Sequence, residues 1–248
     1  MVTGLDRVKT MFWCREVFLR LGIDDPGQLS MTKSNEDNLL SISNKLEAKD
    51  QDLVFELFLS GADNPKWEKY FYGERVPANT SNGRSKNRPI RSLVNLVFKG
   101  TESYFDNGPY GIFRVLSCDN FNKAVENLTL ACEKFFKAND INCPRGTEGG
   151  KGYITWDVSV VTNLTDKSDW NFEEIQRYLF NLTVYYYDDH IPELLLLSIA
   201  AAKIQSRFLQ SQRFMDILGS DPEFSGRETG LEAMERSFGV DRRVWLNL

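Results

Sequence analysis

Apolar residues recur at intervals of three and four along the beginning of the chain. The series comprises Val8, Met11, Phe12, Phe18, Leu19 and Leu21, and it ends at Gly22 before the turn Asp24-Asp25-Pro26-Gly27. This spacing is typical of an amphipathic helix, and glycine commonly follows the last helical residue. The pattern predicts a first helix that ends near Leu21.

Three further helices are predicted before residue 74. One begins near Ser34 and a second runs from Leu53 to Leu59. The third opens at Asn64-Pro65, where asparagine suits the cap and proline suits the first helical position. It continues through Trp67, Tyr70 and Phe71 and ends at Gly73.

The pattern of apolar and polar residues changes in the middle of the chain. Segments 92–98 and 110–117 carry β-branched and aromatic residues between turn-like breaks, and segment 153–161 alternates apolar and polar residues. These features are typical of β-strands. They predict three strands in a small, mainly antiparallel sheet.

Helical spacing returns in the second half of the chain. After Asp119, a candidate cap, the apolar residues Phe121, Ala124, Val125, Leu128, Ala131, Phe135 and Phe136 form one stripe, which we expect to lie on the sheet. Another helix is expected from Ser168 or Asp169. The helix that begins near Pro192 is apolar almost all round, so we expect it at the centre of the molecule.

These elements predict an α+β fold that is predominantly helical. A single domain over residues 1–248 is the simplest organisation. A subdivision is also open, with a helical part over 1–73, a sheet-containing part over 74–167 and a helical part over 168–248.

Charge is distributed unevenly along the chain. Six basic residues and no acidic ones occur between Arg75 and Lys99, whereas the whole chain has a formal charge of −5. The six are Arg75, Arg84, Lys86, Arg88, Arg91 and Lys99, and much of this basic segment has the composition of a long loop. Such a segment is suited to phosphate contacts, although it is also compatible with a solvated charged loop.

A glycine-rich stretch, residues 143–157, raises a second possibility of phosphate binding. It lacks the spacing G-x-x-x-x-G-K-[ST], and it is predicted to precede a strand rather than a helix. Glycines that tolerate positive φ in a connection explain it most simply. The remaining option is a flap whose Arg145 and Lys151 close over phosphate.

Carboxylates and the single histidine supply the candidates for catalysis. Asp188, Asp189 and His190 precede the helix near Pro192, where carboxylates suit the positive helix end. Alternatively, Asp157 joins Asp188, Asp189 or Glu193 as oxygen ligands of Mg²⁺. Because there is one histidine and no common hydrolase motif, an enzyme is the less favoured reading, and no cofactor is expected outside this Mg²⁺ alternative.

The remaining features concern location and partners. The four cysteines have no paired spacing, no secretory signal is recognisable, and the densest apolar run is shorter than the about 20 residues that span a bilayer. We therefore expect a cytoplasmic protein without a membrane segment. The terminal residues Val244, Trp245, Leu246 and Leu248 are expected to pack on the chain itself or on a protein partner or second copy.

The leading functional hypothesis is a protein that binds a nucleic-acid backbone or another phosphate-bearing ligand through the basic segment, within a larger assembly. The first alternative is a Mg²⁺-dependent nuclease or phosphohydrolase that uses Asp157 with Asp188 and Asp189. The second is a protein–protein interaction subunit that uses its apolar C-terminal tail.

Overall fold

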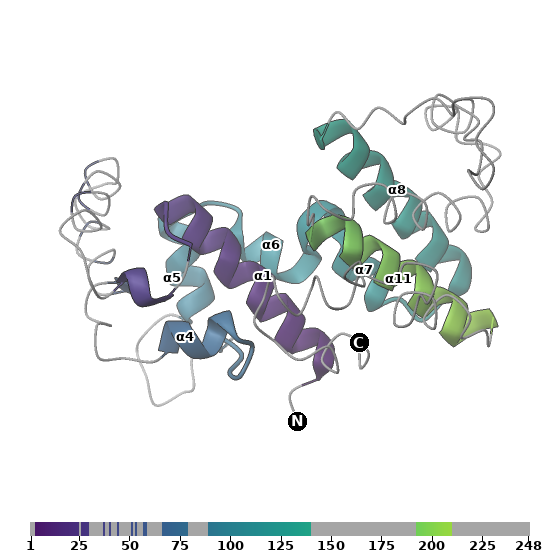
Figure 1. The fold of residues 1–248 in the computed structure, drawn as a ribbon, viewed down its shortest axis with the longest axis horizontal. Coiled ribbons are helices and arrows are strands. Elements are labelled where there is room, and N and C mark those ends of the chain that lie inside the picture. The colour runs from purple at the N-terminus through teal and green to yellow at the C-terminus, as the bar shows by residue number, and fades with distance from the viewer. Residues whose placement is uncertain are drawn as a thin grey trace, which may run out of the picture. The chain divides into compact units, whose positions relative to one another are not determined.

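The computed structural model describes residues 3–24, 26–29, 66–78, 89–139 and 192–209, and the single positions Asp37, Leu40, Asn44, Gln51, Leu53, Leu57 and Phe58. The elements in these ranges are α1 (Gly4–Leu21), η1 (Pro26–Leu29), α4 (Lys66–Phe71), α5 (Ile90–Val97), α6 (Thr101–Asn107), η3 (Pro109–Gly111), α7 (Ile112–Leu116), α8 (Phe121–Asn139) and α11 (Pro192–Leu209). Figure 1 shows their arrangement. Every element within these ranges is helical.

The predicted α+β class is therefore wrong where it can be compared with the structure. The segment predicted as a strand over 92–98 forms most of helix α5, and the segment over 110–117 forms η3 and α7. The third predicted strand, 153–161, lies outside the described residues. The described part of the chain contains no sheet on which α8 could lie.

The spacing of apolar residues explains α5. Ile90, Leu93, Val94 and Val97 follow the intervals of a helix and do not alternate. The β-branched composition suggested a strand, but strand propensity depends strongly on context. Burial of one helical face, with Val94 and Val97 buried, outweighs it here.

Two glycines explain α7. Gly108 (φ 72°) ends α6, and Gly111 (φ 89°) precedes α7, so both residues adopt the positive φ that glycine tolerates best. The five residues that follow bury Ile112, Phe113 and Val115. A segment this short has no periodicity of its own to read, so its conformation follows from packing.

Helix α1 confirms the first predicted helix. Thr3 and Asp6 form a capping box at its beginning, and Gly22, in the left-handed conformation, ends it. Its buried residues lie on several sides of the helix because α4, α6 and α7 all contact it. Leu19 is an exception to the predicted stripe, since it is 74% exposed.

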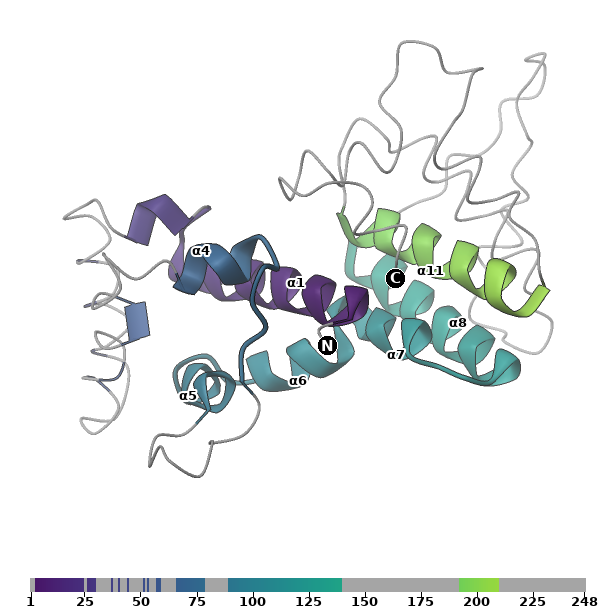
Figure 2. The same ribbon diagram turned by 90° about the horizontal axis from the view of Figure 1, so that it is seen from below.

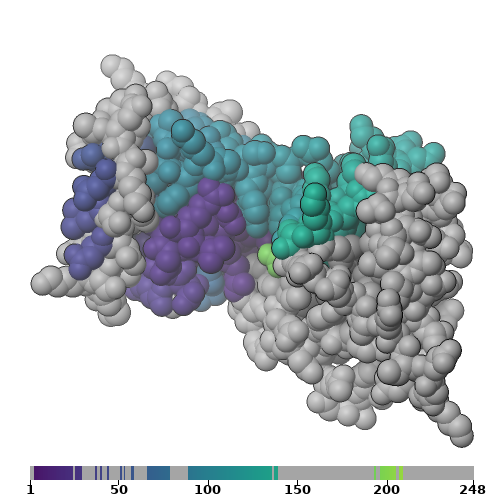
Figure 3. Space-filling view, turned by 90° about the horizontal axis from the view of Figure 1, so that it is seen from above, coloured from purple at the N-terminus to yellow at the C-terminus, as the bar shows by residue number. Residues whose placement is uncertain are grey.

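Aromatic rings fill the core around α1. Trp13 stacks on Trp67 with ring centroids 5.7 Å apart, and Phe58 stacks on the same indole at 5.1 Å. Figure 2 shows α4 and α6 on opposite sides of α1. In the space-filling view of Figure 3, the purple atoms of α1 lie directly against the blue-green atoms of residues 89–117. This core holds both ends of the basic segment.

The described residues from Cys118 onward belong to a second compact unit, while those up to Ser117 belong to the first. The prediction of a single domain stays a prediction, because one domain can contain two compact units. No helix in the described ranges has the length and apolar character needed to span a bilayer.

Helices α8 and α11 form the described part of the second unit. The Phe121 ring, at the beginning of α8, lies 5.8 Å from the Phe208 ring at the end of α11, so the two helices are antiparallel. The predicted stripe on α8 is confirmed for Ala124, Leu128, Ala131 and Phe135. All residues from 196 to 202 are buried, as the apolar sequence of α11 predicts.

The capping residue of α8 differs from the prediction. The Lys123 backbone N–H donates to Oδ1 of Asn120 at 3.0 Å, so Asn120 caps the helix. Asp119 instead accepts from Arg207 Nη2 at 2.6 Å. Asp119 therefore links α11 to the segment before α8.

Candidate phosphate-binding segment

The beginning of the basic segment is fixed on α1. After α4 ends, the backbone N–H groups of Glu74 and Arg75 both donate to the Lys69 carbonyl, at 2.8 and 3.2 Å. Nε of Arg7, on α1, donates to the Gly73 carbonyl at 3.0 Å. These bonds hold the turn that leads into the segment.

Arg75 is exposed and lies close enough to Tyr70 to influence its ionisation. Burial raises the pKa of the Tyr70 hydroxyl above its ordinary value, and the positive charge of Arg75 opposes this rise. Arg75 thus presents its guanidinium to solvent beside a mostly buried ring. Glu74, its neighbour, is also exposed.

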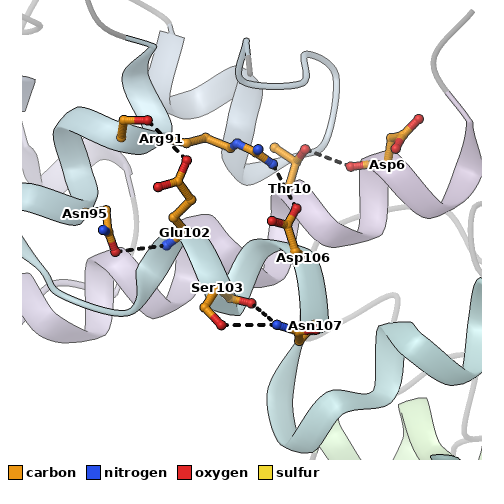
Figure 4. A network of polar contacts seen from close by, with 9 residues as sticks. Asp6, Thr10, Arg91, Asn95, Glu102, Ser103, Asp106 and Asn107 are labelled. Carbon is orange, nitrogen blue, oxygen red and sulfur yellow. Dashed lines mark hydrogen bonds and ion pairs between the residues drawn. The ribbon is translucent and has the colours of Figure 1, made fainter. Parts of the chain in front are cut away.

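Arg91 has entirely different surroundings. Its side chain is 4% exposed, and Nη1 lies 3.2 Å from Oδ1 of Asp106. The guanidinium carbon lies 4.2 Å from the centroid of the Phe105 ring, a cation–π distance. Figure 4 shows Arg91 reaching from α5 toward Asp106 on α6.

Further polar contacts join α5 to α6. The Ser92 hydroxyl donates to Oε1 of Glu102 at 3.1 Å. Oδ1 of Asn95 accepts from the backbone N–H groups of Gly100, at 2.8 Å, and Glu102, at 3.3 Å, both at the start of α6 (Figure 4 draws the second). Asn95 therefore supplies the acceptor that a helix start needs, although it lies on the preceding helix.

The end of the basic segment is also attached to α1. The Lys99 carbonyl accepts from Nη1 of Arg20 at 2.8 Å, while the Lys99 side chain is exposed. Arg20 also pairs with Glu16 at 2.7 Å. The two described ends of the segment are consequently held by the same helix.

The other predicted contact residues lie outside the described residues. They are Arg84, Lys86 and Arg88 in the basic segment and Arg145 and Lys151 in the glycine-rich stretch. Among the residues predicted to contact phosphate, the structure therefore places Arg75 and Arg91, one exposed and one buried.

The catalytic candidates are described at one position. Glu193 lies in the first turn of α11 and is half-buried. Asp157, Asp188, Asp189 and His190 lie outside the described residues, as do Val244, Trp245, Leu246 and Leu248. The described ranges contain no group of three or more His, Cys, Asp or Glu side chains that could hold a metal ion.

Three cysteines are described, and all are free thiols: Cys14, Cys118 and Cys132. Burial raises the pKa of the Cys14 and Cys132 thiols well above their ordinary value. Since the thiolate is the nucleophile, these two groups are suited to packing rather than to chemistry.

Sequence reasoning missed the buried position of Arg91. Arg91, Val94 and Phe98 recur at intervals of three and four, and all three are buried. That spacing places the arginine on the apolar stripe of α5 once the segment is read as a helix. Asp106, its partner, carries no comparable signal.

Comparison of the chain with protein-family models, with curated proteins and with solved structures gives no significant match.

Proposed function

We propose that this protein binds the phosphate groups of a nucleic-acid backbone or of another phosphate-bearing ligand through the basic segment. The observation that carries the proposal is the run of six cations without an anion in a chain whose net charge is −5. The proposed contact residues are Arg75, which is exposed in the structure, and Arg84, Lys86 and Arg88, which lie outside the described residues. An acidic remainder repels polyanions and so favours their approach at this segment.

The described ends of the segment support this assignment in one respect. A segment whose two ends are fixed has fewer conformations open to it, so binding a ligand costs it less conformational entropy. Here the bonds from Arg7 and Arg20 attach the two ends to α1. The backbone at Gly73 and at Lys99, on either side of these cations in the sequence, is therefore held on α1.

Salt dependence provides the test. Each cation that neutralises a phosphate of single-stranded nucleic acid contributes about −0.7 to the slope of log K against log salt concentration. Replacing Arg84, Lys86 and Arg88 with alanine should reduce the steepness of this slope by about 2 in titrations of a fluorescent single-stranded oligonucleotide. Inorganic polyphosphate, as a second probe, distinguishes a nucleic-acid ligand from a general phosphate ligand.

Lys134 and Lys137 provide a matched control. They are exposed on α8, outside the basic segment, and their replacement with alanine removes positive charge from a different place. We expect this variant to retain the wild-type slope. If it lowers the slope as much per charge as the segment variant, net charge governs binding and the proposal is wrong.

The same titrations separate binding from catalysis. The protein is proposed to be cytoplasmic and to form part of a larger assembly. Because it is proposed to bind and not to cleave, the oligonucleotide should remain intact with and without Mg²⁺. Cleavage that requires Mg²⁺ and is lost in Asp157→Asn would assign an enzymatic role instead. A change in oligomeric state alone, on removal of 244–248, would favour the interaction subunit.

A further inference from the structure

Arg91 is distinguished from the other described cations of the basic segment by its burial. Asp106 and Phe105, which lie beside its guanidinium, are both on α6. The carboxylate offsets the positive charge, and the ring lies within cation–π distance of the guanidinium. The side chain thus connects the beginning of α5 to the middle and end of α6.

We propose that Arg91 is a positioning residue of the basic segment: it holds α5, the helix within the segment, on α6 and does not itself contact phosphate. This inference rests on the proposed function. A phosphate could reach the guanidinium only after the ion pair and the ring contact had been broken. Asp106, whose side chain is 58% exposed, is solvated without Arg91, whereas Arg91 is not solvated where it lies.

Arg91 lies close in the sequence to the cations that are proposed to bind phosphate. Pro89 and Ile90 connect it directly to Arg88, the last cation before α5. The ring of Pro89 fixes its φ, here −56°. Holding Arg91 on α6 therefore fixes the backbone as far as Pro89, the residue to which Arg88 is joined in the sequence.

The alternative is that Arg91 itself binds phosphate, and that its guanidinium leaves Asp106 when a polyanion binds. The two roles differ in what can replace the arginine. A positioning residue can be replaced by an uncharged side chain that fills the same space against Phe105, because its contribution is to hold α5 on α6. A phosphate ligand cannot be replaced by any uncharged side chain.

Arg91→Met and Arg91→Ala provide the first test. Methionine is flexible and apolar and packs well against aromatic rings, whereas alanine leaves the space empty. In oligonucleotide titrations, Arg91→Ala should weaken binding on the order of tenfold at fixed salt, with the wild-type salt slope, and Arg91→Met should restore most of the affinity. If both variants reduce the steepness of the slope by about 0.7, Arg91 contacts phosphate and the inference is overturned.

Asp106→Ala and Glu102→Gln form the second test, because each removes one negative charge from α6. Asp106 pairs with Arg91, whereas the Glu102 carboxylate accepts a hydrogen bond from the Ser92 hydroxyl. A positioning role predicts weaker binding in Asp106→Ala than in Glu102→Gln, because α5 loses its attachment. Tighter binding in Asp106→Ala than in the control would mean that the freed arginine engages phosphate.

Amide hydrogen exchange of residues 90–97 distinguishes failure of this inference from failure of the proposed function. Anchoring predicts faster exchange in Arg91→Ala and near wild-type exchange in Arg91→Met, with or without a ligand. If this order is found but neither probe binds the wild-type protein, the proposed function is wrong and the anchor remains. If the probes bind while Arg91→Ala exchanges at the wild-type rate, the anchor is wrong and the function remains.

Discussion

Substitution of Gly108 by alanine should be among the most destabilising single changes in the first compact unit. Gly108 has φ 72° and ψ −177°, a backbone region that is nearly restricted to glycine. A Cβ atom there would lie 2.7 Å from Cγ and Cδ2 of Phe113, a ring that is completely buried. Both the backbone and the buried ring would have to shift to accept one methyl group.

The expected magnitude follows from these two effects. Backbone strain of this kind costs about 1–3 kcal/mol, and overpacking of a core adds about 1–3 kcal/mol. Gly108→Ala should therefore lower the local free energy of unfolding by about 2–6 kcal/mol. Gly111→Ala is the matched control, because its φ is also positive, at 89°, but nothing lies within 4 Å of the added Cβ.

Hydrogen exchange of residues 101–116, read by mass spectrometry, measures both changes locally and is independent of the second unit. Gly111→Ala should lower the free energy of opening by about 1–2 kcal/mol, the cost of the left-handed conformation alone. Equal or smaller destabilisation in Gly108→Ala would show that the contact with Phe113 does not restrict this position. If the contact does restrict this position, adding Phe113→Leu to the Gly108→Ala variant should recover part of the lost stability.

Two further predictions concern α8 and the buried thiols. Asn120→Ala removes the cap of α8 and should destabilise the second unit by about 1 kcal/mol. Asp119→Ala breaks an exposed ion pair and should change the stability of that unit by less than about 1 kcal/mol. If thermal unfolding shows the larger loss in Asp119→Ala, Asn120 is not the cap. The raised pKa values of Cys14 and Cys132 mean that the folded state keeps both protons at a pH where the unfolded chain loses them. The stability that each thiol contributes in this way is fully present below about pH 8.5. Above that pH, the free energy of unfolding should fall as the pH rises, by up to about 1.4 kcal/mol per pH unit for each thiol. Replacing both cysteines with alanine should make the free energy of unfolding, measured with urea, depend less on pH above about pH 8.5. If the variant loses stability with pH as steeply as the wild type, the thiols are not the cause.

The long helices and the short helix α4 could be predicted from the sequence, whereas α7 could not. Helices α1, α8 and α11 each contain several turns, so their apolar spacing repeats often enough to define a period. Helix α7 has five residues, fewer than two turns. Its conformation depends on Gly108 and Gly111 and on burial of Phe113, and those constraints come from the rest of the fold.

The candidate site could be predicted in composition but not in the role of each cation. The charge imbalance of residues 75–99 is a property of the sequence. Whether a cation is exposed depends on which helix face it occupies. The sequence predicts a strand over 92–98 with Arg91 in the loop before it, so the burial of Arg91 beside Val94 does not follow from that prediction, and its pairing with Asp106 depends on how α6 packs.

The central position of α1 has a consequence for the order in which the protein is made. Arg7 and Arg20 find their acceptors 66 and 79 residues further along the chain, at Gly73 and Lys99. During synthesis the helix therefore emerges long before the segments that cover Met11, Phe12 and Trp13. Nascent chains that stop short of Phe113 would expose this apolar surface, and we expect them to bind chaperones or aggregate until the first unit is complete.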